Sequence, residues 1–184
     1  MKLKYNDYSN LPIGKYYEIL DICNSDLSKI EKDLAVIAVL LDVTEDEVYK
    51  LKPEEVYELQ QQLKFLSKPA TGNSRKIKKI NIAGKDYKVL SKLDELNIGQ
   101  YVDFQFSWNN DHLDNLQEIL SIFIIPEGCK YNEGYDIVEV QQAIKDNLSI
   151  EAALDIAFFL QRKLVDLIKS RLLYFRLVLW VMKM

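Results

Sequence analysis

The residues of this chain best able to carry chemistry are one histidine, a few acidic clusters and one basic run. His112 is the only histidine and follows Asp111, so a multi-histidine metal site is excluded and a surface residue is the simpler interpretation. The six glycines never take the GxGxxG or GxxxxGK[ST] spacing of phosphate-binding loops, and no serine lies in a nucleophile elbow. We therefore expect no catalytic residue, no metal site and no cofactor.

The acidic clusters have a structural explanation. They are Glu45-Asp46-Glu47, Glu54-Glu55 and Asp94-Glu95, and each falls where a helix is expected to begin. Carboxylates in the first turn interact favourably with the positive end of the helix dipole. We expect them to stabilise helices and not to act as acids, bases or metal ligands.

The single basic run has two interpretations. It consists of Arg75, Lys76, Lys78 and Lys79 around Ile77. Such a run can contact the phosphates of nucleic acid, but charges on an edge strand also discourage pairing with other sheets. Because no aromatic ladder accompanies the run and acidic residues resume at Asp86, we favour the edge-strand interpretation and keep nucleic-acid contact as the alternative.

Composition indicates a folded protein whose net charge gives no general attraction to nucleic acid. The 184 residues are 48% hydrophobic and 28% charged, with a net charge of -4 and a pI of about 5.2. Cys23 and Cys129 are too isolated to form a disulfide framework. The first residues lack the apolar stretch of a secretory signal, and no run of about 18 apolar residues predicts a membrane span.

Helical signals dominate the chain. Ser28 with Glu31 and Thr44 with Glu47 are spaced as capping boxes, and Pro53 suits the first position of another helix. Apolar residues at three- and four-residue spacing follow each start. The residues we place in the core include Ile30, Leu34, Ile37, Leu59, Leu63, Leu120, Phe123, Val140 and Ile144.

Two segments interrupt the helices. Residues 67–74 are polar and rich in breakers, which predicts an exposed linker and a domain boundary. Two short apolar-bearing runs then flank Ala83-Gly84, the pattern of a β-hairpin. The expected fold is mainly α, with an N-terminal helical unit (1–66), a linker with the hairpin (67–95), a second helical unit (96–148) and a long hydrophobic C-terminal helix (149–184).

An internal repeat relates the two helical units. Residues 11–18 match 96–103 with leucine, isoleucine, glycine and tyrosine in register, and Gly14 thereby matches Gly99. Residues 27–37 match 113–123, and 55–63 match 136–144, in the same order. Amphipathic helices resemble one another, but the shared glycine and tyrosine are not explained by helix periodicity. We therefore predict two related units.

The C-terminal residues form the most apolar segment. Its seam residues have the alternating three- and four-residue spacing of a coiled coil, and its last turns are apolar nearly all round, so it must be buried by the rest of the chain or by a partner. Membrane attachment is disfavoured because 172–182 is short and contains Arg176. The expected partner-binding residues are Val165, Ile168, Leu172, Phe175, Leu179, Trp180 and Met182.

Several short stretches resemble a known group of proteins. They are LLDVTEDEV (40–48), LKPEE (51–55), GKDYKV (84–89), LDELNIGQYVD (93–103) and IPEG (125–128). Together they resemble tail assembly chaperones of tailed bacteriophages over most of residues 11–147. The resemblance implies a non-enzymatic helical protein that holds aggregation-prone virion proteins, such as a tape-measure protein, in the host cytoplasm. It implies no catalytic residues.

Three classes of function remain open from the sequence. The first is a phage protein acting through protein contacts, either as an assembly chaperone or as a structural component of the virion head or tail, with self-association as a further option. The second is a nucleic-acid-associated protein using residues 75–79. The third is an enzyme whose residues follow no known pattern.

Overall fold

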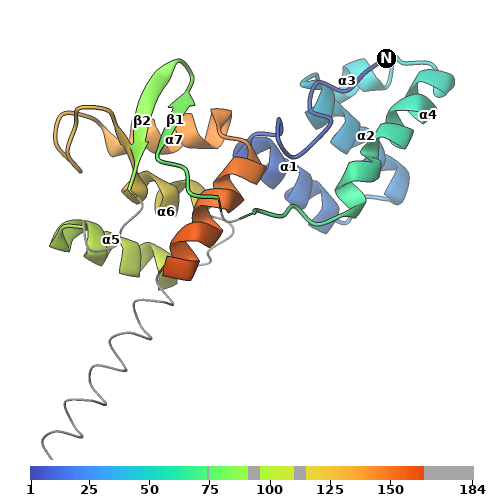
Figure 1. Ribbon diagram of the computed structural model, residues 1–184. Coiled ribbons are helices and arrows are strands. Elements are labelled where there is room, and N and C mark those ends of the chain that lie inside the picture. The colour runs from blue at the N-terminus through green and yellow to red at the C-terminus, as the bar shows by residue number, and fades with distance from the viewer. Residues whose placement is uncertain (74, 91–95, 110–114, 164–184) are drawn as a thin grey trace, which may run out of the picture.

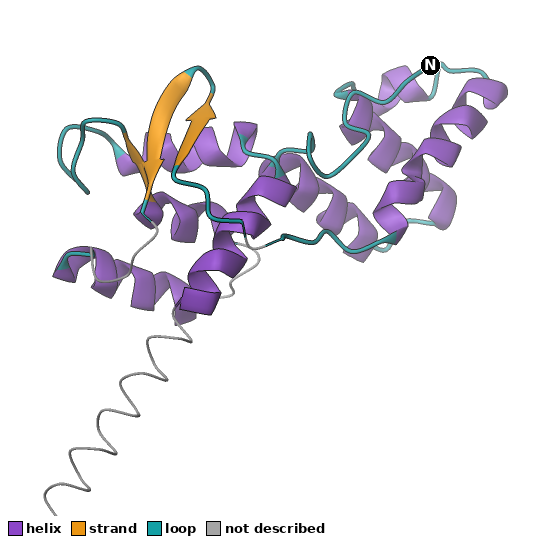
Figure 2. Ribbon diagram, in the orientation of Figure 1, coloured by secondary structure: helices purple, strands orange, loops and turns teal. Residues whose placement is uncertain are grey.

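A computed structural model describes the chain except for residues 74, 91–95, 110–114 and 164–184. The described part is mainly helical with a small antiparallel sheet, which confirms the expected class (Figures 1 and 2). The N-terminal half holds α1 (Ile13–Asn24), α2 (Lys29–Leu41), α3 (Glu45–Val48), α4 (Pro53–Gln62) and the 3-10 helix η1 (Leu63–Ser67). The C-terminal half holds β1 (Lys79–Ile82), β2 (Lys85–Val89), α5 (Ile98–Asn109), α6 (Leu116–Phe123), β3 (Ile124–Pro126), α7 (Ile137–Asn147) and a helix over 150–163.

The predicted helix starts are confirmed. The Ser28 backbone N–H donates to the Glu31 carboxylate at 2.8 Å, and the Thr44 N–H donates to Glu47 at 2.9 Å. Pro53 is the first residue of α4. These contacts satisfy N–H groups that the first helical turn leaves unpaired.

The hairpin is also confirmed, and a third strand joins it. Ala83 and Gly84 both have positive φ, at 51° and 80°, as a two-residue type I′ turn requires. β1 pairs with β2, and β2 pairs with β3, so β1 is an edge strand. The sequence did not predict β3, which is three residues long and directly follows α6.

The two halves are joined by backbone hydrogen bonds. The Ile13 N–H donates to the Leu148 carbonyl at 3.0 Å, and the Ile150 N–H donates to the Leu11 carbonyl at 2.8 Å. One continuous core includes buried side chains from Leu3 to Leu160. The N-terminal segment that precedes α1 contributes Leu3 to this core.

Most of the predicted core residues are buried, and one is not. Six of them are buried, Leu34 and Leu63 are half-buried, and Ile30 is 69% exposed. Ile30 was therefore wrongly placed. It lies in the first turn of α2, where the helix does not yet face the rest of the core.

The linker is packed more tightly than a breaker-rich segment suggests. The Asn73 N–H donates to the Asp155 carboxylate. A Cβ added to Gly72 would lie 2.6 Å from the backbone of Leu154 and Asp155. This part of the segment therefore lies against the helix over 150–163, while most of the described linker residues are exposed, as expected.

The predicted repeat shows partial structural parallels. α1 and α5 both have 12 residues and begin at the matched isoleucine, so Gly14 and Gly99 are each the second residue of a helix. The third pair starts differently, because Glu55 is the third residue of α4 whereas Asp136 is the N-cap of α7. The duplication stays a prediction.

Candidate protein-binding surface

Hydrogen bonds at the N-terminus of α5 fix which side of this helix faces the core. The Asn97 N–H donates to the Gln100 side chain at 3.1 Å, and the Gln100 N–H donates to Asn97 Oδ1 at 2.9 Å. The buried Gln100 amide also donates to the Ile122 carbonyl at 3.0 Å. A buried amide is costly without partners, so these bonds hold α5 against the end of α6.

Two further contacts hold the same side of α5. Phe104 is buried and meets Phe123 edge-to-face, with ring centroids 5.4 Å apart. The Tyr131 hydroxyl donates to the Asp103 carboxylate at 2.8 Å. Burial, and then this hydrogen bond to the anionic Asp103, raise the pKa of Tyr131 well above its usual range. The only charged residue of α5 is thus occupied by a structural contact.

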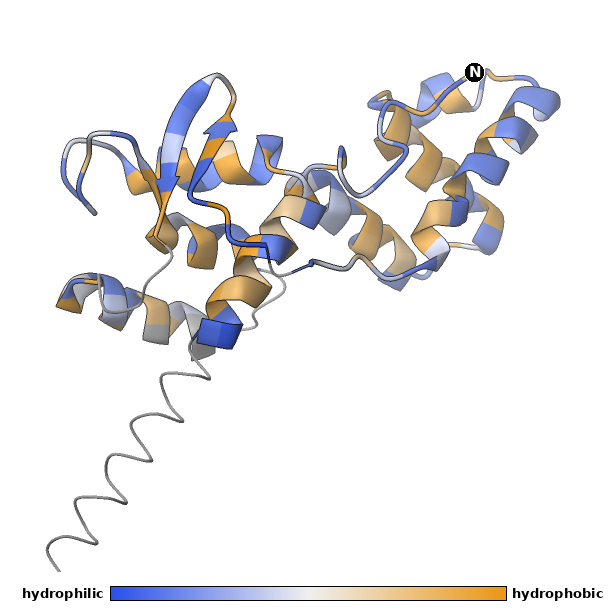
Figure 3. Cartoon of the chain, viewed as in Figure 1, coloured by the Kyte–Doolittle hydropathy of each residue, from blue (hydrophilic) through white to orange (hydrophobic). Residues whose placement is uncertain are grey.

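The opposite side of α5 is an open apolar face. Ile98, Val102 and Phe106 recur every four residues and are 79%, 56% and 70% exposed, with Tyr101 beside them at 44%. We call these four residues the α5 face. Figure 3 shows several hydrophobic stretches along this helix. A helix that is apolar on both sides normally has both sides buried, and an exposed apolar cluster of this kind marks an interaction site.

The residues of α1 that match the α5 face in the predicted repeat are more buried than that face. Ile13 is fully buried and Tyr16 and Tyr17 are half-buried, whereas Ile98, Tyr101 and Val102 are exposed. Ile13 is covered where α1 meets α7 and residue 148. No described element covers the α5 face in the same way.

The partner-binding residues predicted from the sequence lie outside the described residues. They are Val165, Ile168, Leu172, Phe175, Leu179, Trp180 and Met182. The helix over 150–163 leads to them and is itself part of the core, because Ile150, Ala153, Ile156 and Leu160 are buried. The helix over 150–163 therefore belongs to the folded core, and the predicted partner-binding residues that follow it stay a prediction.

The structure places only one residue of the basic run on the edge strand. Arg75, Lys76 and Lys78 are exposed just before β1, and Lys79 opens that edge strand. Lys79 forms an ion pair with Glu127, and the hydrogen bond to this carboxylate raises the pKa of Lys79. This lysine is therefore used within the protein.

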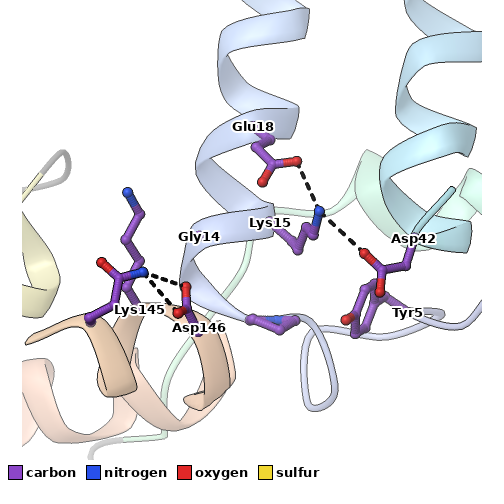
Figure 4. A pocket seen from close by; sticks show the side chains of 9 residues that line it. Tyr5, Gly14, Lys15, Glu18, Asp42, Lys145 and Asp146 are labelled. Atoms are coloured by element: carbon purple, nitrogen blue, oxygen red, sulfur yellow. Dashed lines mark hydrogen bonds and ion pairs between the residues drawn. The ribbon is translucent and has the colours of Figure 1, made fainter. Parts of the chain in front are cut away.

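A polar cavity of about 430 Å³ lies between the N-terminal segment, α1 and α7 (Figure 4). Lys15 Nζ lies 3.2 Å from Glu18 and 3.4 Å from Asp42, and Lys4 also pairs with Asp42. Burial by itself would lower the pKa of Lys15, but Glu18 and Asp42 outweigh it and leave that pKa raised. The hydrogen bond from Lys4, with help from Lys15, lowers the pKa of Asp42.

This cavity is best explained as part of the packing contact between α1 and α7. Its lining includes two lysines, Lys15 and Lys145, against three carboxylates, so it offers no excess of positive charge to an anion. A Cβ on Gly14 would lie 3.3 Å from the Lys145 side chain and carbonyl. The small residue lets α1 and α7 approach closely.

The remaining sequence candidates give no chemical site in the described part of the chain. The clusters at 45–47 and 54–55 occupy the first turns of α3 and α4, as predicted. His112, Asp111, Asp94 and Glu95 lie outside the described residues. Among the residues that are described, no group of three or more metal-ligating side chains gathers, and no helix is long and apolar enough to span a membrane.

Sequence reasoning missed the α5 face, although the four-residue spacing of Ile98, Val102 and Phe106 was visible. It could not decide which of two apolar sides is buried, because that depends on the distant partners of Gln100 and Phe104.

Comparisons with protein-family models, curated proteins and solved structures gave no match.

Proposed function

We propose that this chain is a non-enzymatic bacteriophage assembly protein that binds other proteins through apolar helical surfaces. In this role it holds an aggregation-prone virion protein, such as a tape-measure protein, in the host cytoplasm until assembly. The observation that carries the binding role is the α5 face, where Ile98 and Phe106 are 79% and 70% exposed on a well-anchored helix. The phage setting rests on the sequence resemblance alone.

Covering the α5 face with another apolar surface is energetically favourable. Each large apolar side chain gains roughly 1.5–3 kcal/mol on full burial, so four of them in one patch favour contact with another apolar surface. An aggregation-prone helical client offers that kind of surface. The apolar segment 165–182, expected from its sequence to bind a partner, would be a second binding element.

Nucleic-acid binding and a structural role in the virion are the competing functions. The first is disfavoured because Lys79 is paired within the sheet and the net charge is -4. The second uses the same apolar surfaces, but it predicts that the protein remains in the finished particle.

Co-expression with a tape-measure protein from the same genome tests the proposal. We expect the tape-measure protein to move from the insoluble to the soluble fraction and to co-purify with this chain. Phe106→Asp should abolish the effect. Ile30→Asp, at a residue 69% exposed on α2, is the matched control and should retain it.

Two results would contradict the proposal. One is a tape-measure protein that stays insoluble with the wild-type chain. The other is a genome whose neighbouring genes encode no virion proteins. Recovery of the chain from purified particles would favour the structural role instead.

A further inference from the structure

We infer that two copies of this protein exchange their C-terminal segments, so that residues 165–182 of one copy cover the α5 face of the other. This inference rests on the proposed function only in treating the α5 face as a protein-binding surface. It names the occupant of that face when no client is present: the apolar segment of a second copy.

Charge pattern argues against pairing between the two C-terminal segments themselves. Arg162, Lys169, Arg176 and Lys183 recur every seven residues, and the last three each directly follow a seam residue. These flanking positions face their counterparts across a coiled coil. Arg171 occupies the other flank of the seam, so parallel and antiparallel pairs of identical segments would both bring like charges together.

Charge also favours contact with the body of the protein. Residues 162–184 contain six basic residues and one acidic residue, a net charge of +5. Since the whole chain carries -4, residues 1–161 carry -9. A basic apolar segment and an acidic body with an open apolar face are complementary in both charge and hydropathy.

The sequence that leads into the apolar segment favours contact with the α5 face of a second copy over contact with the α5 face of the same copy. No glycine or proline follows Gly134, so nothing in the sequence breaks the helix that begins at 150. A segment without such a turn signal is poorly suited to reverse onto α5 of its own copy, which favours a second copy.

Reciprocal exchange closes the assembly. If each copy supplies one segment and one α5 face, a two-fold dimer satisfies both and leaves neither open. Leu160, which precedes the segment, and Phe104 of α5 belong to the same core, so the segment and the face are attached to one folded core. A client would then compete with the partner copy for the same apolar residues.

Sedimentation of the purified full-length chain over a range of concentrations tests the exchange. We expect a dimer for the wild type, and an apparent dissociation constant raised at least about thirtyfold for Phe106→Asp and for Phe175→Asp, the cost of losing a central anchor. Ile30→Asp should dimerise as the wild type does. Circular dichroism checks that each variant is folded; Phe106 is 70% exposed, so its replacement should leave the body intact.

A mixing experiment separates exchange from other dimers. Each variant alone has lost both contacts, but a 1:1 mixture of Phe106→Asp and Phe175→Asp chains can form one intact contact, from the normal segment of the first to the normal face of the second. We expect the mixture to recover heterodimer at concentrations where each variant is monomeric.

Three outcomes would overturn the inference. A wild-type chain that stays monomeric until a foreign protein or a lipid vesicle is added would show a different occupant. A Phe106→Asp chain that dimerises normally would indicate pairing between the segments. A mixture that stays monomeric would place the two residues in separate interactions. Because these measurements use the pure protein, failure to capture a tape-measure protein would not affect them.

Discussion

At the residue scale, single side chains decide how tightly the two halves fit together. Gly72 lets the linker lie on the backbone of the helix over 150–163, and Gly14 does the same between α1 and α7. Asp42 ends α2 in the left-handed conformation, with φ at 60°, and receives Lys4 and Lys15. Each of these residues acts through local geometry that composition alone does not reveal.

We expect Gly72→Ala to destabilise the protein by about 1–3 kcal/mol, the usual cost of forcing an extra carbon into a packed site. Its Cβ would lie 2.6 Å from backbone atoms of Leu154 and Asp155, which cannot rotate away. Gly99→Ala is the control, since its Cβ would meet only an Asn97 side-chain atom at 3.3 Å. Urea unfolding measures both; equal midpoints for the two variants would refute the close approach.

A pH effect follows from the lowered pKa of Asp42. Because Lys4, and then Lys15, favour the carboxylate in the folded state, its stabilisation is present above the unfolded pKa and is lost as pH falls through the folded pKa. Asp42→Asn keeps a residue that tolerates the left-handed conformation. We expect this variant to be less stable than the wild type at neutral pH and equally stable once the carboxyl is protonated.

The measurement for Asp42 is the urea midpoint at pH 7 and at successively lower values down to about pH 2, so that the lowered pKa of the folded carboxyl is also passed. Asp21→Asn, on the exposed side of α1, is the control and should show no such convergence. A difference between wild type and Asp42→Asn that persists in acid would show that the ion pairs are not its cause.

At the scale of single elements, the hairpin and α5 are each set by a few contacts. The two positive φ angles at Ala83 and Gly84 turn β1 into β2, and β3 then pairs with β2 through Tyr87, Lys88 and Val89. α5 is held by the Asn97–Gln100 cap, by Phe104 and by Asp103. Those contacts leave its second apolar side outward.

Ala83 carries avoidable strain in the hairpin. A non-glycine residue in the left-handed region costs roughly 1–2 kcal/mol, and asparagine tolerates that region better than alanine does. We expect Ala83→Asn to raise the thermal midpoint and Ala83→Val to lower it, because a branched side chain is least compatible with positive φ. Calorimetry of both variants decides; a stabilising valine would show that the turn has another geometry.

At the scale of the whole molecule, the sequence predicted elements better than it predicted their arrangement. Capping boxes, Pro53 and the Ala83-Gly84 turn are local signals, and all were confirmed. The third strand was missed because Ile124 and Ile125 acquire strand geometry only by pairing with residues near 88. The close contact of Gly72 with residue 154 could not be predicted because it joins distant parts of the chain.

The same division holds for the candidate surface. The apolar segment 165–182 is visible in the sequence because its seam is a local pattern. The α5 face became visible only when Gln100 and Phe104 were seen to occupy the other side of the helix. Tertiary contacts determine which side of such a helix stays exposed.

The most direct test of the account is the accessibility of residue 106 in solution. Phe106→Cys is placed in a chain whose Cys23 and Cys129 are replaced by serine, and thiol labelling is timed for the full chain and for one ending at residue 163. We expect slow labelling in the full chain and fast labelling in the shortened chain, with Ile30→Cys fast in both. Equally fast labelling of residue 106 in both chains would contradict the claim that the C-terminal segment and the α5 face bind each other.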